Sequence, residues 1–435
     1  MEVTNEIPVW LLIPFIVMLL TIAIAPLVAE HKWEDNRIKA IITAIIAVPT
    51  AIILICMGIT HELIHQVVFD YVPFIILLLS LFVVTGGLRI KGDIVASPLA
   101  NTIILYIGFI LASFMGTTGA AMLLIRPLLE INKQRTRKTH TVLFFIALVA
   151  NCGGLLTPLG DPPLFLLYLR GAEFSWFFKL LPEWAFTGVL LLTIYYIWDT
   201  IEFKKEPLSA HKRDVAEATS LRVKGRINFL WLLLVIASVV FLNETYIPQM
   251  GTNIALKFLR EYALIIIIIL SLLTTKRVVR KRNHFTWGPI VEVAILFAGI
   301  FVTMTPALMF LNTHAASLGL SSAAQFYYFT GGLSSFLDNA PTAVSFYTVA
   351  QGLVENGTIV SEATMAGIPE MILAAISIGS VFFGSMTYIG NGPNFMVKSI
   401  AENSGVKMPG FFAYIVKFSL IVLLPVYILV ELIFI

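Results

Sequence analysis

The chain has 435 residues and a formal net charge of +3, and 58% of its residues are hydrophobic while only 13% are charged. Soluble domains have roughly 45–50% apolar and about 25% charged residues, so this composition excludes a soluble globular protein. The two cysteines, Cys56 and Cys152, lie in apolar segments, which excludes a disulfide framework. We therefore predict an all-α polytopic membrane protein whose surroundings are the lipid bilayer, without a nucleic acid partner.

Ten apolar runs are predicted to cross the membrane, because about 20 apolar residues suffice for a helical span. They cover residues 7–29, 39–59, 70–88, 139–169, 176–199, 227–243, 262–274, 289–312, 369–401 and 411–434. The preceding residues 1–6 are acidic, whereas a signal peptide begins with basic residues. We therefore expect the first run to be retained as a helix.

Two further apolar stretches, residues 99–131 and 319–350, are each interrupted near the middle by a Ser-Phe motif. Each is too long for one helix and too short for two full spans, so we predict two re-entrant hairpins with polar tips at mid-membrane. Irregular backbone at that depth must line a cavity or be buried in protein. The spans at 139–169 and 369–401 contain central glycines and prolines and are predicted to be broken helices.

Both kinds of interruption occur twice. Residues 157–165 and 387–395 fit one template, T-x-x-G-x-x-P-x-F, and lie 230 positions apart. Residues 113–121 match residues 335–343 with an offset of 222. Paired apolar segments broken by Gly and Pro point to the binding site of a secondary transporter.

The distribution of basic residues predicts the topology. Loops 132–138, 200–226 and 275–286 are rich in Lys and Arg and are expected in the cytoplasm, whereas loop 351–368 has neither residue and is expected outside. These four placements agree only if the first hairpin enters and leaves from the cytoplasm and the second from outside.

The two halves then have opposite orientations, which is an inverted repeat. Residues 1–200 form the first repeat, with about five helices, a hairpin and a broken helix. Residues 201–226 form a cytoplasmic linker, and residues 227–435 form the second repeat with the same parts. Both termini are predicted to lie outside.

Asp161 is the strongest candidate for an ion-binding residue, because it lies in a Gly-Asp-Pro-Pro sequence in the middle of an apolar span. Carbonyls freed by the break can coordinate a cation while the carboxylate supplies charge. An intramembrane carboxylate is costly and is a functional hypothesis by default. It can hold either a proton or a metal cation, which is the minimal chemistry of an antiporter. The alternative is that Asp161 only caps the second half-helix.

The two hairpin tips supply further oxygen atoms. These come from Ser113, Thr117, Thr118, Ser335, Asp338, Asn339 and Thr342. Such ligands suit hard cations, so we predict a Na+ or Li+ site formed by Asp161 and the Asp338 region. The alternative is turn formation, since Asp-Asn and Gly-x-x-Gly are ordinary turn sequences.

Five polar residues flank the broken spans and are further candidates for ion binding. They are Asn151, Thr157, Thr387, Asn391 and Asn394. Asn and Thr in membrane helices also hydrogen-bond neighbouring helices, which is the alternative reading of each.

Glu292 begins a span just after Pro289. It fits a proton-relay carboxylate, and it fits equally a first-turn acid favoured by the helix dipole.

Residues 61–65 match the zinc-peptidase motif H-E-x-x-H. We expect this segment to be a short outside connector rather than a helix, and the only further ligand in its vicinity is Asp70. No P-loop, dinucleotide fingerprint or nucleophile elbow occurs, so we expect neither nucleotide-driven transport nor an enzyme.

The sequence resembles NhaD-type sodium/proton antiporters of the ion transporter superfamily. The resemblance lies in GGLLTPLGDPP over residues 153–163, WGPIVEVA over residues 287–294, and residues 335–342, within a match from about 70 to 400. It implies a Na+(Li+)/H+ antiporter of the bacterial inner membrane, without a cofactor, that exchanges monovalent cations for protons. It also implies elevator-type movement in a homodimer.

The hairpin tips depart from one branch of that superfamily. Its dicarboxylate symporters carry Ser-Asn-Thr at both tips, whereas this chain has Gly-Thr-Thr-Gly and Asp-Asn-Ala-Pro. The Asp338 charge would repel a carboxylate substrate unless a cation screens it. We therefore predict cation/proton exchange, with arsenite export or dicarboxylate/sodium symport as the alternative.

Overall fold

The computed structural model describes residues 7–33, 35–217, 219–361 and 363–435; the acidic residues 1–6 and position 362 of loop 351–368 lie outside these ranges. Eight helical segments of the described chain are long and apolar enough to cross a membrane. They are Val9–Pro26, Asn36–Cys56, Thr60–Gly86, Pro98–Met115, Thr139–Leu156, Phe174–Phe203, Gly288–Thr313 and Phe411–Phe434. The predicted class, an all-α polytopic membrane protein, is confirmed.

The first half of the chain contains α1 to α11 and two strands. The helices are α1 (Ile13–Val28), α2 (Glu30–Trp33), α3 (Asn36–Cys56), α4 (Thr60–Ile64), α5 (Val72–Gly86), α6 (Pro98–Met115), α7 (Thr117–Ile131), α8 (Thr139–Leu148), α9 (Pro162–Leu169), α10 (Leu181–Phe203) and α11 (Leu208–Glu217), with short 3-10 or π segments at Val9–Leu12, His65–Tyr71, Cys152–Leu156 and Phe174–Leu180. The strands are β1 (Arg89–Asp93) and β2 (Thr219–Lys224).

The second half contains α12 to α23. The helices are α12 (Ile227–Phe241), α13 (Gln249–Thr252), α14 (Ile254–Lys257), α15 (Leu259–Thr274), α16 (Arg277–Arg282), α17 (Gly288–Thr313), α18 (Ala323–Ser334), α19 (Asn339–Glu355), α20 (Glu370–Phe383), α21 (Gly392–Asn403), α22 (Phe411–Tyr414) and α23 (Leu424–Phe434), with short segments at Ala315–Leu318, Gly384–Met386 and Ile415–Leu423. The two-residue strands β3 (Thr364–Met365) and β4 (Ile368–Pro369) pair with each other.

The segment before α5 differs from the prediction. We expected a span at 70–88 preceded by a loop, but α4, the π-helical turn and α5 form one apolar helical stretch over Thr60–Gly86. The helix continues across its polar residues because they have partners: the Asp70 carboxylate lies 3.2 Å from Arg170, and the His65 ring contacts Phe69. The expectation that residues 61–65 are not helical is therefore wrong.

The first hairpin is formed by α6 and α7. By length and composition α6 could cross a membrane, yet its beginning lies beside the end of α7. The side chains of Asn101 and Asn132 exchange two hydrogen bonds, of 2.9 and 2.8 Å. Both arms therefore start and finish at one end of the molecule, and the turn at Gly116 lies in the interior.

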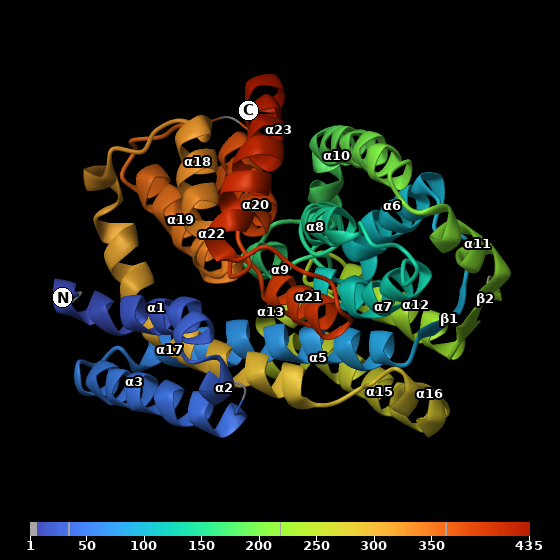
Figure 1. Cartoon of the computed structure of the whole chain (residues 1–435). Helices are drawn as coiled ribbons and strands as arrows, with labels where there is room; N and C mark the ends of the chain where they lie inside the picture. Colours follow the sequence, from blue (N-terminus) through green and yellow to red (C-terminus); the bar gives the residue numbers. More distant parts are fainter. Residues whose placement is uncertain (1–6, 34, 218, 362) are drawn as a thin grey trace.

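The three basic loops lie together at that end. The Lys133 ammonium is 3.0 Å from Asp93 and 3.1 Å from Glu217, which joins loop 132–138 to β1 and α11. Strand β1 pairs antiparallel with β2, which the sequence did not predict, and α16 packs against β1. Figure 1 shows β1, β2, α11 and α16 gathered at one side of the molecule.

Loop 351–368 lies at the opposite end. The Tyr347 hydroxyl donates to the carbonyls of Arg170 and Ala366, and Arg170 binds Asp70 in the π-helical turn just before α5. Helix α5 runs from there to β1, so these two groups of loops are separated by its length. Which end faces the cytoplasm stays a prediction, as does the inverted orientation of the halves.

The core surrounds the first broken helix. Every residue of α8 from His140 to Leu148 is buried, as are the large side chains of Phe144, Phe145 and Phe165. Figure 1 shows α8 and α9 enclosed by the hairpins, α10, α20 and α23, with α1, α3, α5 and α17 packed below them. Polar groups of the broken segments are thus held away from solvent.

Candidate functional site

The Asp161 carboxylate is the centre of the candidate site. Its Oδ1 accepts hydrogen bonds from the Thr117 hydroxyl at 2.7 Å and from Asn391 Nδ2 at 3.1 Å. Its Oδ2 accepts one from Asn339 Nδ2 at 2.5 Å. The exposed fraction of these four residues is between 1% and 3%, so the carboxylate is enclosed by protein.

These four residues come from equivalent positions of the two repeated motifs. Thr117 and Asn339 are equivalent in the hairpin motif, and Asp161 and Asn391 are equivalent in the broken-helix motif. The two hairpin tips therefore meet at the same carboxylate. The repetition of these motifs in the sequence is the reason we predicted that their residues share one site.

Each of the four residues also stands at the beginning of a helix. Thr117 and Asn339 are the first residues of α7 and α19, while Asp161 and Asn391 directly precede α9 and α21. Helix N-termini carry partial positive charge, so all four helices favour negative charge at this point. The Asp161 side chain caps none of the α9 amides, and its position is therefore not explained by helix capping alone.

Backbone contacts fix the hairpin tips to the broken helices in the same way in both halves. The hydroxyl of Thr157 donates to the carbonyl of Ser113, and that of Thr387 donates to the carbonyl of Ser335. In the first half the Thr117 amide also donates to the Gly160 carbonyl at 2.8 Å. The predicted residues Thr157 and Thr387 thus position the tips rather than contact Asp161.

Close backbone approaches explain the glycines of the template. A Cβ atom on Gly160 would lie 2.0 Å from the Gly154 carbonyl oxygen, and one on Gly390 would lie 2.6 Å from that of Gly384. No side chain fits in either place.

An amide network extends the site on the side of the second half. Asn151 Nδ2 donates to Asn394 Oδ1 at 2.7 Å, and Asn391 Nδ2 lies 3.2 Å from Asn151 Oδ1. Asn394 in turn donates to the carbonyls of Gly384 and Thr387. Asn151 and Asn394 therefore orient Asn391 without touching the carboxylate.

The remaining predicted tip residues make local bonds. Asp338 caps α19 by accepting from the Ala340 amide at 3.0 Å, and Thr342 donates to the Asp338 carbonyl. The hydroxyls of Ser113 and Ser335 donate to the carbonyls of Gly153 and Gly331. Thr118 is half-buried beside Thr117. Asp338 thus caps α19 and makes no hydrogen bond to Asp161, whereas its neighbour Asn339 does; its predicted part in ion binding stays a prediction.

One oxygen at the site has no partner in the described part of the chain. Asn339 Oδ1 is buried and accepts no hydrogen bond, although the amide nitrogen of the same side chain binds Asp161. A buried acceptor without a donor is rare and needs an explanation. With the carboxylate beside it, this oxygen can coordinate a hard cation.

Glu292 is not brought to this site. Its carboxylate lies 2.6 Å from the ammonium of Lys39, a buried residue of α3. The sequence reasoning missed Lys39, although a lysine inside the apolar run 36–56 was a visible signal. A relay role for Glu292 would have to include this ion pair.

The structure shows no metal site at the H-E-x-x-H match among the described residues. Among the described residues no group of three or more His, Cys, Asp or Glu side chains is placed to hold a metal ion. Asp70 is engaged with Arg170 instead.

Comparison with known proteins agrees with a membrane transporter. A 46 kDa membrane protein of Mycobacterium leprae (strain TN) is 25% identical over 377 residues, which are 78% of this chain and 81% of that protein. The model of a family described as "Putative citrate transport" matches residues 4–435, almost the entire chain. The protein therefore belongs to this family of membrane transporters.

Proposed function

We propose that the protein exchanges Na+ or Li+ for protons across a bacterial inner membrane, with Asp161 binding the cation and the proton alternately. The observation that carries this proposal is the enclosed carboxylate with an unpaired oxygen, Asn339 Oδ1, beside it. In the described part of the chain, no Lys or Arg forms an ion pair with Asp161. An unpaired carboxylate inside a membrane protein suits a cation or a proton.

The amide of Asn339 gives the site two hydrogen-bonding states. When Asp161 is ionised, Asn339 Nδ2 donates to it and Oδ1 is available to a cation. When Asp161 is protonated, rotation of the amide by half a turn would present Oδ1 as the acceptor for the new O–H. Proton and cation then compete for the same carboxylate, which couples their movements. The site would be reached from the two membrane faces in turn, by movement within a homodimer as in the family that the sequence resembles.

The test is an everted-vesicle assay that follows internal pH when NaCl, LiCl, KCl or a carboxylate is added. Wild type should respond to Na+ or Li+, and Asp161→Asn should abolish the response while the protein remains inserted. Asp35→Asn is a suitable control, because Asp35 is an exposed helix cap and Asn caps a helix about as well. Substantial exchange by Asp161→Asn would contradict the role of Asp161 as the ion-binding carboxylate.

Symport of a carboxylate with sodium is the second candidate, and two observations favour it. The description of the family is putative citrate transport. Four helix N-termini converge at the site, and helix N-termini favour the anionic groups of a substrate. Sodium-dependent uptake of citrate or a dicarboxylate, without a pH response to Na+ alone, would favour symport over antiport.

A further inference from the structure

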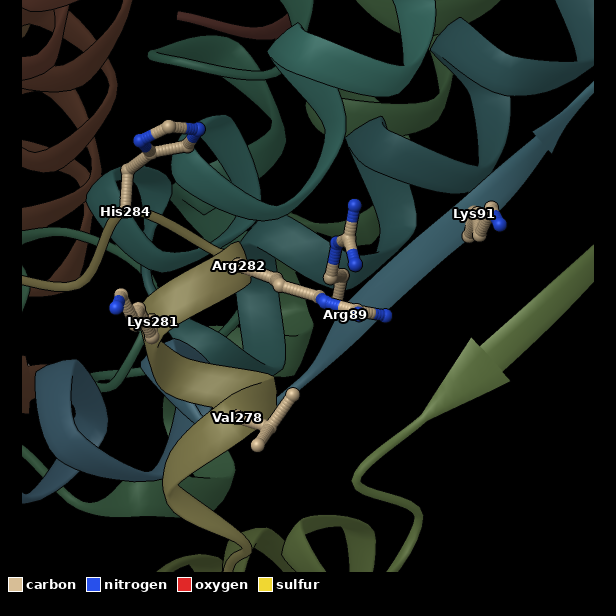
Figure 2. Close-up of a pocket in the computed structure, with 6 residues that line it drawn as sticks. All are labelled: Arg89, Lys91, Val278, Lys281, Arg282 and His284. Atoms are coloured by element: carbon tan, nitrogen blue, oxygen red, sulfur yellow. The ribbon is translucent and has the colours of Figure 1, made fainter.

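A pocket at the basic-loop end is lined by Lys, Arg and His side chains and by one valine. Its volume is about 790 Å³, and its lining residues are Arg89, Lys91, Val278, Lys281, Arg282 and His284, which together we name the basic pocket. Figure 2 shows the Arg282 side chain of α16 extending toward Arg89 of β1. The size falls within the range of pockets that bind small organic ligands.

The charges of the basic pocket are not neutralised within the described residues. None of its lysine, arginine or histidine side chains has a carboxylate within ion-pair distance there. Nearby acids are engaged elsewhere: Asp93 and Glu217 bind Lys133. The Glu206 carboxylate accepts hydrogen bonds from the amides of Thr136 and Arg137. Burial raises the pKa of this carboxyl, but the hydrogen bonds lower the pKa by more, so it stays below its usual value.

The β1–β2 ribbon adds like-charge pairs. Its register places Arg89 opposite Lys224 and Lys91 opposite Arg222. Like charges directly opposite each other destabilise an antiparallel pair. An anion bound beside the ribbon would neutralise Arg89 and Lys91 and relieve this repulsion.

The pocket is built on a rigid support. The Arg280 guanidinium on the other face of α16 donates to the Val83 carbonyl at 2.6 Å and to the Ser271 hydroxyl at 2.9 Å. Asn283 donates to the Gly86 carbonyl, and the Phe285 ring packs against Gly86 so closely that a Cβ there would lie 2.4 Å from it. Lys281 and Arg282 therefore project from a helix that is fixed to the ends of α5 and α15, while Arg89 and Lys91 come from β1.

Exposed apolar side chains on α16 and on the chain segments before and after it indicate the kind of anion. Val278 lines the pocket and is 58% exposed, and Leu273 at the end of α15 is 76% exposed. Trp287, at the beginning of α17, is also exposed, and Trp is enriched at membrane interfaces. A ligand with a phosphate and acyl chains satisfies both the charges and these surfaces.

We propose that the basic pocket binds the phosphate headgroup of an anionic phospholipid at the membrane face that carries the basic loops. Basic pockets at helix ends on the cytoplasmic side are suited to such headgroups. The lipid would neutralise the β1–β2 ribbon and tie it to α16. This proposal does not depend on which ion or substrate is transported.

The test measures the melting temperature of the full chain in a detergent with a neutral headgroup. The probes are short-chain phosphatidylglycerol, short-chain phosphatidylcholine and inorganic phosphate. Phosphatidylglycerol should raise the melting temperature saturably, and the other two should not at equal concentration. An equal rise with phosphatidylcholine would overturn the charge recognition, and an equal rise with inorganic phosphate would overturn a lipid as the ligand.

A charge-neutralised variant provides the second arm. The triple variant Arg89→Gln, Lys281→Gln, Arg282→Gln should bind phosphatidylglycerol on the order of a hundredfold more weakly. A matched triple variant at exposed lysines outside the pocket, Lys204→Gln, Lys212→Gln, Lys407→Gln, should bind like wild type. Unchanged binding by the first variant would overturn the proposal.

The same variant reports on the like charges without any lipid. Because it removes repulsion, its melting temperature without lipid should equal or exceed that of wild type. A melting temperature below that of wild type would contradict the unneutralised charges on which the proposal rests.

Discussion

At the scale of single residues, the site depends on which hydroxyl or amide points at Asp161. Thr117 and Thr118 are adjacent, yet only the Thr117 hydroxyl donates to the carboxylate. The same holds for Asp338 and Asn339, of which only Asn339 binds Asp161. Neighbouring residues of similar chemistry therefore have different roles, and each pair supplies its own control.

We expect Thr117→Val to raise the Na+ concentration for half-maximal exchange by about tenfold. The change keeps the shape of the side chain and removes a hydrogen bond to a charged group, which contributes on the order of 1.5–3 kcal/mol. Thr118→Val should leave the value close to that of wild type. The measurement is the Na+ concentration for half-maximal exchange in everted vesicles. Equal effects of the two variants would show that the hydrogen bond to Asp161 does not matter for ion binding.

The residues of the site were predictable from the sequence, but their roles were predictable only in part. Asp161, Thr117, Asn339 and Asn391 stand in repeated motifs, and repetition in an apolar chain marks them without any coordinates. The sequence could not separate Asp338 from Asn339, because capping α19 and contacting Asp161 require only different side-chain directions from adjacent positions. The ion pair of Lys39 with Glu292 joins helices far apart in sequence, and no local pattern encodes it.

At the scale of elements, the broken helices depend on two glycine pairs. Gly154 with Gly160 and Gly384 with Gly390 allow backbone segments to approach within a distance that excludes a Cβ. This contact fixes the level at which α9 and α21 begin, and so the position of Asp161 and Asn391.

We expect Gly160→Ala to lower the melting temperature and the yield of folded protein. Its Cβ would meet backbone that cannot rotate away, and overpacking of this kind costs about 1–3 kcal/mol or more. Gly392→Ala is the matched control, because a Cβ at that glycine meets no atom within 4 Å. Thermal unfolding in detergent would be compared, and a stable Gly160→Ala protein with unchanged melting temperature would contradict the close approach.

The elements themselves were predicted unevenly. The hairpins and broken helices were visible because Gly, Pro and polar residues interrupt long apolar runs. The π-helical turn before α5 was missed because its polar residues look like a connector, and their partners come from elsewhere in the chain. The β1–β2 ribbon was missed for a similar reason, since its strands are 126 positions apart at the Asp93–Thr219 pair and read locally as charged loops.

At the scale of the whole molecule, the basic loops occupy one end and loop 351–368 the other. Helix α5 separates the two ends, with Asp70 just before its beginning and β1 after its end. The positive-inside tendency predicts that the basic end faces the cytoplasm.

Cysteine labelling tests this assignment. In a variant with Cys56 replaced by Ser, Arg277→Cys should react with an impermeant reagent only from the cytoplasmic side, and Val360→Cys only from outside. Both positions are exposed, while Cys152 is buried and should stay silent. Labelling of both positions from the same side would rule out the predicted topology.

The contact between Asp161 and Asn391 bears on how such a chain could have arisen. If the two halves descend from one duplicated gene, an ancestor with identical halves would have placed two carboxylates about as close together as Asp161 and Asn391 now lie, at 3.1 Å. Two carboxylates at that distance cannot both be ionised without strong repulsion. An amide at position 391 keeps the hydrogen bond and removes the second charge. Loss of symmetry at this one position would thus have left one carboxylate at this contact instead of two.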